Sequence, residues 1–181
     1  DNASLNVNGT LVANGTSTER IYFTSQYDDA IGGDSNNDMR TTQPDRGNWN
    51  SLYIGSGATS SVLNHIDLRF GGSSSGMLHL ISSDISVTNI QATNSNYYGI
   101  FVDNKPTAFN NITSNTNRFE GIYVQANGAE LQNITTNFND RSGLVIELND
   151  LTEDIIIDSL SAIGNSSHGV YFNDGGTGRN F

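Results

Sequence analysis

The chain has 181 residues, no cysteine, an apolar content of 35% and a formal net charge of −11. The lack of cysteine excludes disulfides, thiolate metal sites and cysteine nucleophiles. Eight Lys and Arg residues are too few for the basic surface that nucleic acids or anionic membranes require, and no apolar run approaches the roughly 20 residues of a membrane span. We therefore expect neither nucleic-acid binding nor membrane insertion.

The first predicted strands are short and faint, around residues 5–7 and 11–12. A clearer strand follows at 21–25, and an acidic loop insertion occupies about 26–48 before the next strand at 51–54. The run at 62–66 then precedes Gly76 in the way that later runs precede their glycines. No signal peptide begins the chain, which we interpret as a mature product or part of a longer protein.

From residue 90 onward the sequence repeats. One glycine recurs at spacings of 22, 22 and 26 residues, and one apolar position recurs at the same spacings. Both shift together at a four-residue insertion near 150–153, as a loop in one repeat would require. The two series are Gly99, Gly121, Gly143 and Gly169, and Ile90, Ile112, Ile134 and Leu160.

Each unit contains two or three short runs of alternating apolar residues separated by turn residues, which favours strands over helices. Strands stacked about 4.8 Å apart in successive coils would bury one narrow apolar column. We predict a single all-β domain over 1–181, a right-handed parallel β-helix of about six coils with roughly 22 residues each. The recurring glycines and asparagines are expected at turn positions with positive φ. An antiparallel sandwich is the alternative, but it would not repeat its sequence.

Four segments, at 9–17, 21–25, 28–38 and 47–54, give the order strand, acidic insert, Gly-x-Trp, strand. This order resembles the right-handed β-helix regions of large secreted, adhesin-like surface proteins of bacteria and archaea. The resemblance implies the fold and an extracellular, cell-surface location. Such regions occur in adhesins, in envelope proteins and beside carbohydrate-active enzymes, so the fold does not define the function.

The acidic insert is the candidate metal site. Alternating carboxylates and amides have the spacing of a calcium loop, although Met39 stands where that loop prefers glycine and Pro44 precedes the last ligand. A hydrated turn stabilised by its own Asp and Asn side chains is the alternative. The predicted calcium ligands are Asp28, Asp29, Asp34, Asn36, Asp38 and Asp45.

One outward position of the repeat is mostly aromatic, and the next outward position contains Asp103 and Glu147. These carboxylates should lie roughly 10 Å apart, beyond the separation of an inverting pair, so we predict no catalytic residues. His65, His79 and His168 fall at unrelated positions. The rings either stabilise the sheet or stack on a ligand; they are Tyr53, Phe101, Tyr123 and Tyr171, with Val145 between the last two.

Six glycosylation sequons complete the candidate sites, at Asn2, Asn8, Asn14, Asn111, Asn133 and Asn165. Because only the 26–48 insert is long enough to flank a cleft, we expect a non-catalytic structural or adhesive module of an extracellular surface or filament protein. A polysaccharide lyase- or hydrolase-like β-helix, or a glycan-binding module, is the alternative. The expected partners are other domains of the same protein, further copies of the chain, or glycans.

Overall fold

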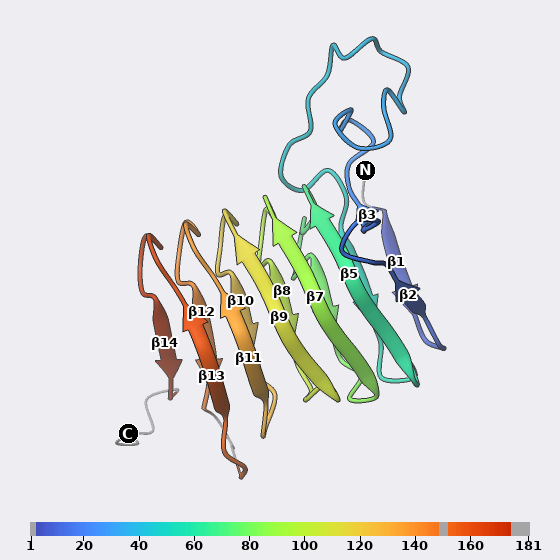
Figure 1. The fold of residues 1–181 in the computed structure, drawn as a ribbon. Coiled ribbons are helices and arrows are strands. Elements are labelled where there is room, and N and C mark those ends of the chain that lie inside the picture. Colours follow the sequence, from blue (N-terminus) through green and yellow to red (C-terminus); the bar gives the residue numbers. More distant parts are fainter. Residues whose placement is uncertain (1–2, 149–151, 175–181) are drawn as a thin grey trace.

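The structure is a computed structural model that describes residues 3–148 and 152–174. These residues form an all-β parallel solenoid of about five turns with about 24 residues per turn, and they contain no helix (Figure 1). The predicted parallel β-helix is therefore confirmed. The turn is longer and the number of turns smaller than predicted, because early turns have steps other than 22: Leu52 pairs with Leu78, whereas Leu78 pairs with Ile100.

Two parallel sheets form the walls of the solenoid. Sheet A contains, in order, β1 (Ser4–Val7), β4 (Ser51–Ile54), β6 (Leu78–Leu80), β8 (Ile100–Val102), β10 (Ile122–Val124), β12 (Leu144–Glu147) and β14 (Val170–Asn173). Sheet B contains β13 (Ile156–Ser161), β11 (Glu130–Thr135), β9 (Ala108–Asn115), β7 (Ile85–Thr93), β5 (Ser61–Arg69) and β2 (Val12–Asn14), and β3 (Ile21–Phe23) also pairs with β5.

The core is a set of apolar rows that run along the solenoid axis. In sheet A, Leu52, Leu78 and Ile100 occupy one inward row and are completely buried. Inward rows in sheet B are equally apolar, as in the pairing of Ile66 with Ile90. Because each coil contributes only a few inward side chains, a chain with 35% apolar residues can fill this column.

The strands of sheet B bend at residues with left-handed backbone. The bend falls at His65, Asn89, Asn111, Asn133 and Ser159, all with φ between 49 and 65°. Asparagine tolerates this conformation better than most residues because its short side chain can hydrogen-bond locally. The prediction of positive φ is thus confirmed for these asparagines.

The prediction is wrong for the recurring glycines, none of which has positive φ. A Cβ atom at Gly121 would lie 2.7 Å from Asn139 Nδ2 and 2.7 Å from the Gly143 carbonyl oxygen. Gly143 meets Asn165 Nδ2 in the same way, at 2.6 Å. The glycine therefore recurs because a column of buried asparagine side chains passes directly beneath it.

That column links successive coils. Asn117 Nδ2 donates to Asn139 Oδ1 at 3.0 Å, and Asn139 Nδ2 donates to Asn165 Oδ1 at 3.0 Å. The backbone amides of Asn117 and Asn139 donate to the same two oxygens. Ser95 begins the column, because its backbone N–H donates to Asn117 Oδ1. We call Asn117, Asn139 and Asn165 the asparagine ladder.

One sequence alignment was displaced by a single residue. The structure places Met77, not Gly76, level with Gly99, because Met77 and Leu78 donate to the carbonyls of Tyr98 and Gly99. The longer step between β4 and β6 caused this error. As a result His79, predicted at an unrelated position, lies in register between Tyr53 and Phe101.

The acidic insert leaves the first coil between β3 and β4 and projects beyond the walls of the solenoid (Figure 1). Its return is anchored by Trp49, whose indole N–H donates to the Arg69 carbonyl at 2.7 Å. The Trp49 ring lies so close to Gly71 that a Cβ atom there would meet it at 2.6 Å. Arg46 extends further along the rod and pairs with Asp140 at 2.6 Å.

Candidate functional site

The outer face of sheet A carries the predicted aromatic stripe. Tyr53, His79, Phe101 and Tyr123 occupy one position in four successive strands. His79 stacks on Phe101 with ring centroids 4.6 Å apart, and Tyr53 and Tyr123 present their edges to this pair at 5.2 and 5.5 Å. The stripe is therefore a ladder of rings packed on one another along the rod.

Sequence reasoning missed a second group of rings, in the turns that lead into sheet A. Tyr97 stacks on Phe119 at 4.3 Å, and the Arg141 guanidinium lies over Phe119 at 4.0 Å. Tyr98 stacks on Tyr123 at 4.8 Å and joins this group to the stripe. The signal was available, because Tyr97, Phe119 and Arg141 recur at steps of 22 residues in the sequence. Phe119 is thus covered on both faces, so its faces are not open to a ligand.

Tyr171 is different from the other rings of the stripe. Val145 separates it from Tyr123, and its ring stacks at 5.1 Å on His168, within its own coil. It is also the more exposed, at 42%. Of the predicted stacking residues, Tyr171 is the one that offers the most ring surface.

The outward carboxylates of sheet A are both engaged. His79 Nε2 and Asp103 Oδ2 are 2.7 Å apart. Glu147 accepts a hydrogen bond from the Tyr123 hydroxyl and another from Asn173 Nδ2 at 2.6 Å. Each carboxylate therefore links neighbouring coils.

Glu120 is a further carboxylate at the edge of the aromatic group. Its Oε2 atom is shielded from solvent and has no hydrogen-bond partner among the described residues. Burial raises the pKa of this carboxyl, and the nearby Arg141 acts in the opposite direction. The site therefore disfavours the charged form of Glu120.

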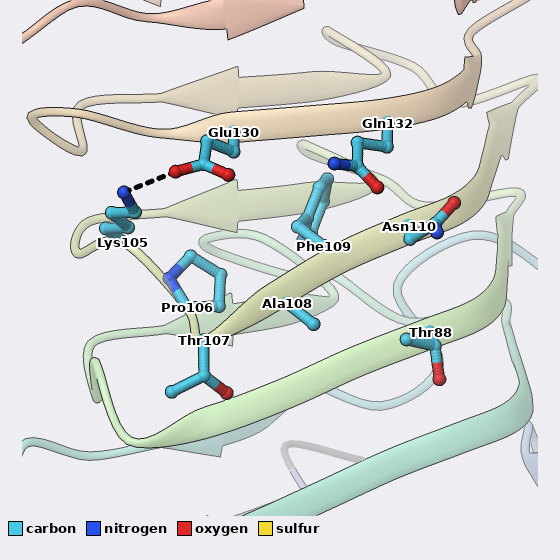
Figure 2. A pocket seen from close by; sticks show the side chains of 9 residues that line it. All are labelled: Thr88, Lys105, Pro106, Thr107, Ala108, Phe109, Asn110, Glu130 and Gln132. Atoms are coloured by element: carbon cyan, nitrogen blue, oxygen red, sulfur yellow. Dashed lines mark hydrogen bonds and ion pairs between the residues drawn. The ribbon is translucent and has the colours of Figure 1, made fainter. Parts of the chain in front are cut away.

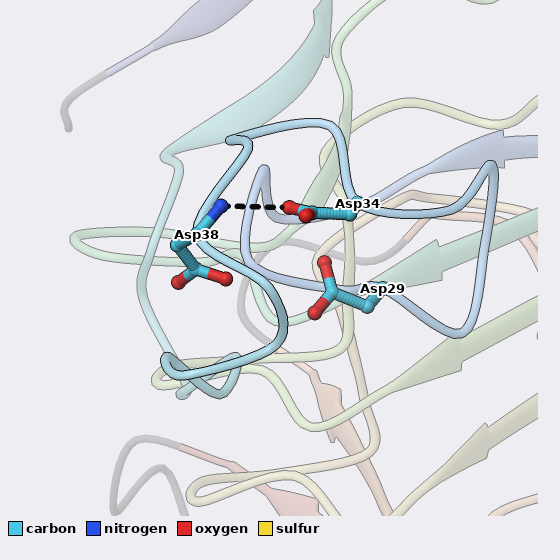
Figure 3. A group of neighbouring side chains, drawn as sticks. All are labelled: Asp29, Asp34 and Asp38. Atoms are coloured by element: carbon cyan, nitrogen blue, oxygen red, sulfur yellow. Dashed lines mark hydrogen bonds between the residues drawn. The ribbon is translucent and has the colours of Figure 1, made fainter.

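Three of the predicted calcium ligands converge in the acidic insert. Carboxylate oxygens of Asp29, Asp34 and Asp38 lie within 4.8 Å of one another (Figure 3). Both Asp29 oxygens and Asn36 Oδ1 are shielded from solvent and lack a hydrogen-bond partner within the described part of the chain. The pKa of Asp29 is raised by burial and by the charges of Asp34 and Asp38. Such unpaired oxygens are what a hard cation binds.

The same loop is also held by its own hydrogen bonds. Asp34 accepts from the backbone amides of Asp38 and Met39, both at 2.9 Å. Hydrogen bonds from the Thr42 hydroxyl and from other donors lower the pKa of Asp38 to about 2. Met39, at the position where a calcium loop prefers glycine, has a φ of 58°, so the loop makes the left-handed turn without glycine. The geometry accommodates both alternatives, a cation site and a hydrogen-bonded turn.

The other two predicted ligands lie outside this group. Asp28 is buried and accepts a hydrogen bond from the Thr24 hydroxyl at 2.6 Å. Asp45 accepts from the backbone amide of Arg46 at 2.7 Å. The structure thus brings Asp29, Asp34 and Asp38 together and uses Asp28 and Asp45 to fix the two ends of the insert.

A shallow pocket lies on sheet B, on another wall of the solenoid (Figure 2). Its lining comes from β7, β9 and β11 and from the turn before β9, and it includes Phe109 and Gln132. Lys105 and Glu130 form an ion pair across one side at 2.7 Å, and both side chains are over 40% exposed. Such an exposed pair contributes little to stability, and the pocket brings no ring stack to a ligand.

The sequons differ in their surroundings. Asn8, Asn14, Asn111 and Asn133 are exposed, whereas Asn2 lies outside the described residues. Asn165 belongs to the asparagine ladder, and its Nδ2 donates to the Thr136 carbonyl at 2.7 Å. A glycan on Asn165 would have to replace that bond.

Comparison of the chain with models of known families, with curated proteins and with solved structures found no match. The resemblance to adhesin-like surface proteins therefore stays a prediction, and the fold is established by the structure. Among the described residues no helix has the length and hydropathy to cross a membrane.

Proposed function

We propose that this chain is a non-catalytic structural module of an extracellular surface or filament protein, built as a stiff spacer. One observation supports it above the others: the outward side chains of sheet A bind one another along the rod. Rings stack between coils, and the carboxylates Asp103 and Glu147 hydrogen-bond to neighbouring coils. A polysaccharide-cleaving face needs an acid and a base directed at the substrate, so this engagement favours a structural role.

The proposal is tested by measuring protease resistance and polysaccharide cleavage on the same preparation. We expect a protease to cut within the insert at 26–48 while the coils from β4 to β14 survive as a fragment, because strands bonded on both sides open rarely. We expect no turnover of neutral or acidic polysaccharides. Turnover that disappears in Glu147→Gln, while Gln132→Glu retains it, would establish the enzymatic alternative.

The second candidate is an adhesive module that binds glycans, and the exposure of Tyr171 favours it. A half-exposed ring with one covered face is suited to stacking on a sugar. Loss of glycan-array binding in Tyr171→Ala, with binding retained in Tyr53→Ala, would support this function. An array without signal would leave the spacer alone.

We further propose that calcium binds the acidic insert through Asp29, Asp34 and Asp38, with Asn36 as a further oxygen ligand. The supporting observation is the set of shielded oxygens that lack a hydrogen-bond partner within the described residues, two on Asp29 and one on Asn36. A divalent cation would neutralise three converging carboxylates and fix the insert. Its role would be structural, consistent with an extracellular spacer.

A further inference from the structure

The exposed large apolar side chains gather at the two ends of the rod. Within the described residues nine such side chains are exposed, and seven of them lie in the first or last coil. Of the remaining two, Met39 lies in the insert and Phe138 in the turn after β11. The seven are Leu5, Val12 and Tyr22 at one end, and Ile156, Ile163, Tyr171 and Phe172 at the other.

These ends are also the edges of both sheets. Sheet A ends at β1 and β14, and sheet B ends at β13 on one side and at β2 and β3 on the other (Figure 1). Phe172 pairs with the fully buried Ile146, so it continues an inward row of the core, yet it is 45% exposed. Leu5 continues an inward row at the other end and is 44% exposed. Each end therefore presents open core rows beside unpaired strand edges.

The two ends fit each other. Strands β1 and β14 both have four residues, and every strand pair in the solenoid is parallel. If β1 of a second copy followed β14, Leu5 would lie over Val170 and Val7 over Phe172, with both sheets continuing. We propose that copies of this chain associate head to tail through these ends. The inference rests on the proposed structural function and names its partner as a second copy.

A second copy suits these ends better than a partner of other chemistry, because a parallel edge with apolar residues at alternate positions accepts another strand of the same pattern. The contact joins two different surfaces, so it does not close at a dimer. The net charge of −11 opposes association, and added salt should strengthen it by screening that repulsion.

The test is sedimentation velocity of the chain over a wide range of protein concentration and at two salt concentrations. We expect species that grow beyond the dimer as concentration rises, and more strongly at high salt. Phe172→Glu and Leu5→Glu, each blocking one end, should both stay monomeric. Met39→Glu is the matched control, because Met39 is 89% exposed but lies in the insert; it should associate like the original chain.

A mixture of the two blocked variants gives the sharpest result. Each variant keeps one intact end, so the mixture should form a heterodimer and nothing larger. Circular dichroism and melting of each variant confirm that it is folded before sedimentation. A chain that is monomeric at every concentration would overturn the inference, as would equal loss of association in Met39→Glu. Protease resistance in a monomeric chain would leave the spacer function standing.

Discussion

Asn117 and Asn139 are joined by two hydrogen bonds across adjacent coils, one from the side chain and one from the backbone of Asn117, both to Asn139 Oδ1 at 3.0 Å. Both residues are almost completely buried. A buried donor without a partner is destabilising, so this ladder fixes which coil lies on which.

Replacing Asn139 with Ala should destabilise the fold strongly. The backbone N–H and Nδ2 of Asn117 would lose their acceptor, at about 1–3 kcal/mol for each buried donor left unpaired. Urea unfolding monitored by circular dichroism measures the change. Gln132→Ala, which removes an exposed amide on β11, is the control and should change stability little. Similar effects of the two substitutions would contradict a stabilising role for the ladder.

Adding one methyl group at Gly121 should be as damaging as losing an asparagine. The new Cβ would lie 2.7 Å from Asn139 Nδ2 and from the Gly143 carbonyl, and such overpacking typically destabilises by about 1–3 kcal/mol. Gly9→Ala is the matched control, because no atom lies within 4 Å of its Cβ position. A Gly121→Ala protein that melts with the original chain would show that the coils separate easily at this point.

Tyr98 and Tyr123 should be energetically coupled if their stacking is structural. A double-mutant cycle with Tyr98→Ala and Tyr123→Ala should give a coupling energy of about 0.5–1.5 kcal/mol. Tyr53 and Tyr171, in distant coils of the same face, should give additive changes. Additivity in the Tyr98–Tyr123 pair, together with lost glycan binding, would favour the adhesive function instead.

Glu120→Gln should stabilise the protein at neutral pH. Because burial raises the pKa of Glu120 above 4.5, the folded state holds this proton more tightly than the unfolded chain. Stability contributed by Glu120 therefore falls as pH rises from 4.5 through the raised pKa, and stays low above it. The melting temperature of Glu120→Gln should exceed that of the original chain at pH 7, with a smaller difference below pH 4.5. A less stable variant at pH 7 would mean that Arg141 stabilises the carboxylate.

Calcium should raise the melting temperature and a chelator should lower it. Binding to the folded insert alone would add about 2.7 kcal/mol at a hundredfold excess over the dissociation constant. Magnesium should be much less effective, because it requires stricter octahedral geometry. Asp29→Asn is the most specific variant, since it removes charge without breaking a hydrogen bond that the structure contains.

The Asp29→Asn protein should melt at or above the temperature of the calcium-free chain and should not respond to calcium. Asp34→Ala with Asp38→Ala should also abolish the response, but these changes remove turn hydrogen bonds as well. Asp154→Asn, an exposed carboxylate near β13, is the control. If calorimetry detects no calcium binding at millimolar concentration, the insert is a hydrogen-bonded turn only.

The repeat made most of the fold predictable, because every in-register pair from Leu78 to Ile146 follows a step of 22 residues that is visible in the sequence. The bends at Asn89, Asn111 and Asn133 were predictable for the same reason. The role of Gly121 was not, because composition cannot distinguish a positive φ from a close approach. His79 was misplaced because an irregular step hid its register.

The candidate sites were less predictable than the fold. Spacing identified the acidic insert, but only the path of the loop separates Asp29, Asp34 and Asp38 from Asp28 and Asp45. The stacking of Tyr97 on Phe119 depends on turn geometry that alternating strand patterns do not contain.

The stacking of coils in register is the central claim, and spin labels test it most directly. The chain has no native cysteine, so labels can be placed in pairs. Asn110 pairs with Gln132 in the neighbouring coil, and Thr88 pairs with Asn110 on the other side, so Thr88 and Gln132 lie two coils apart. Labels on Cys variants of residues 110 and 132 should show strong dipolar broadening, at a strand spacing of about 4.8 Å, and labels at 88 and 132 clearly less. Equal or weaker broadening for the 110–132 pair would contradict the solenoid.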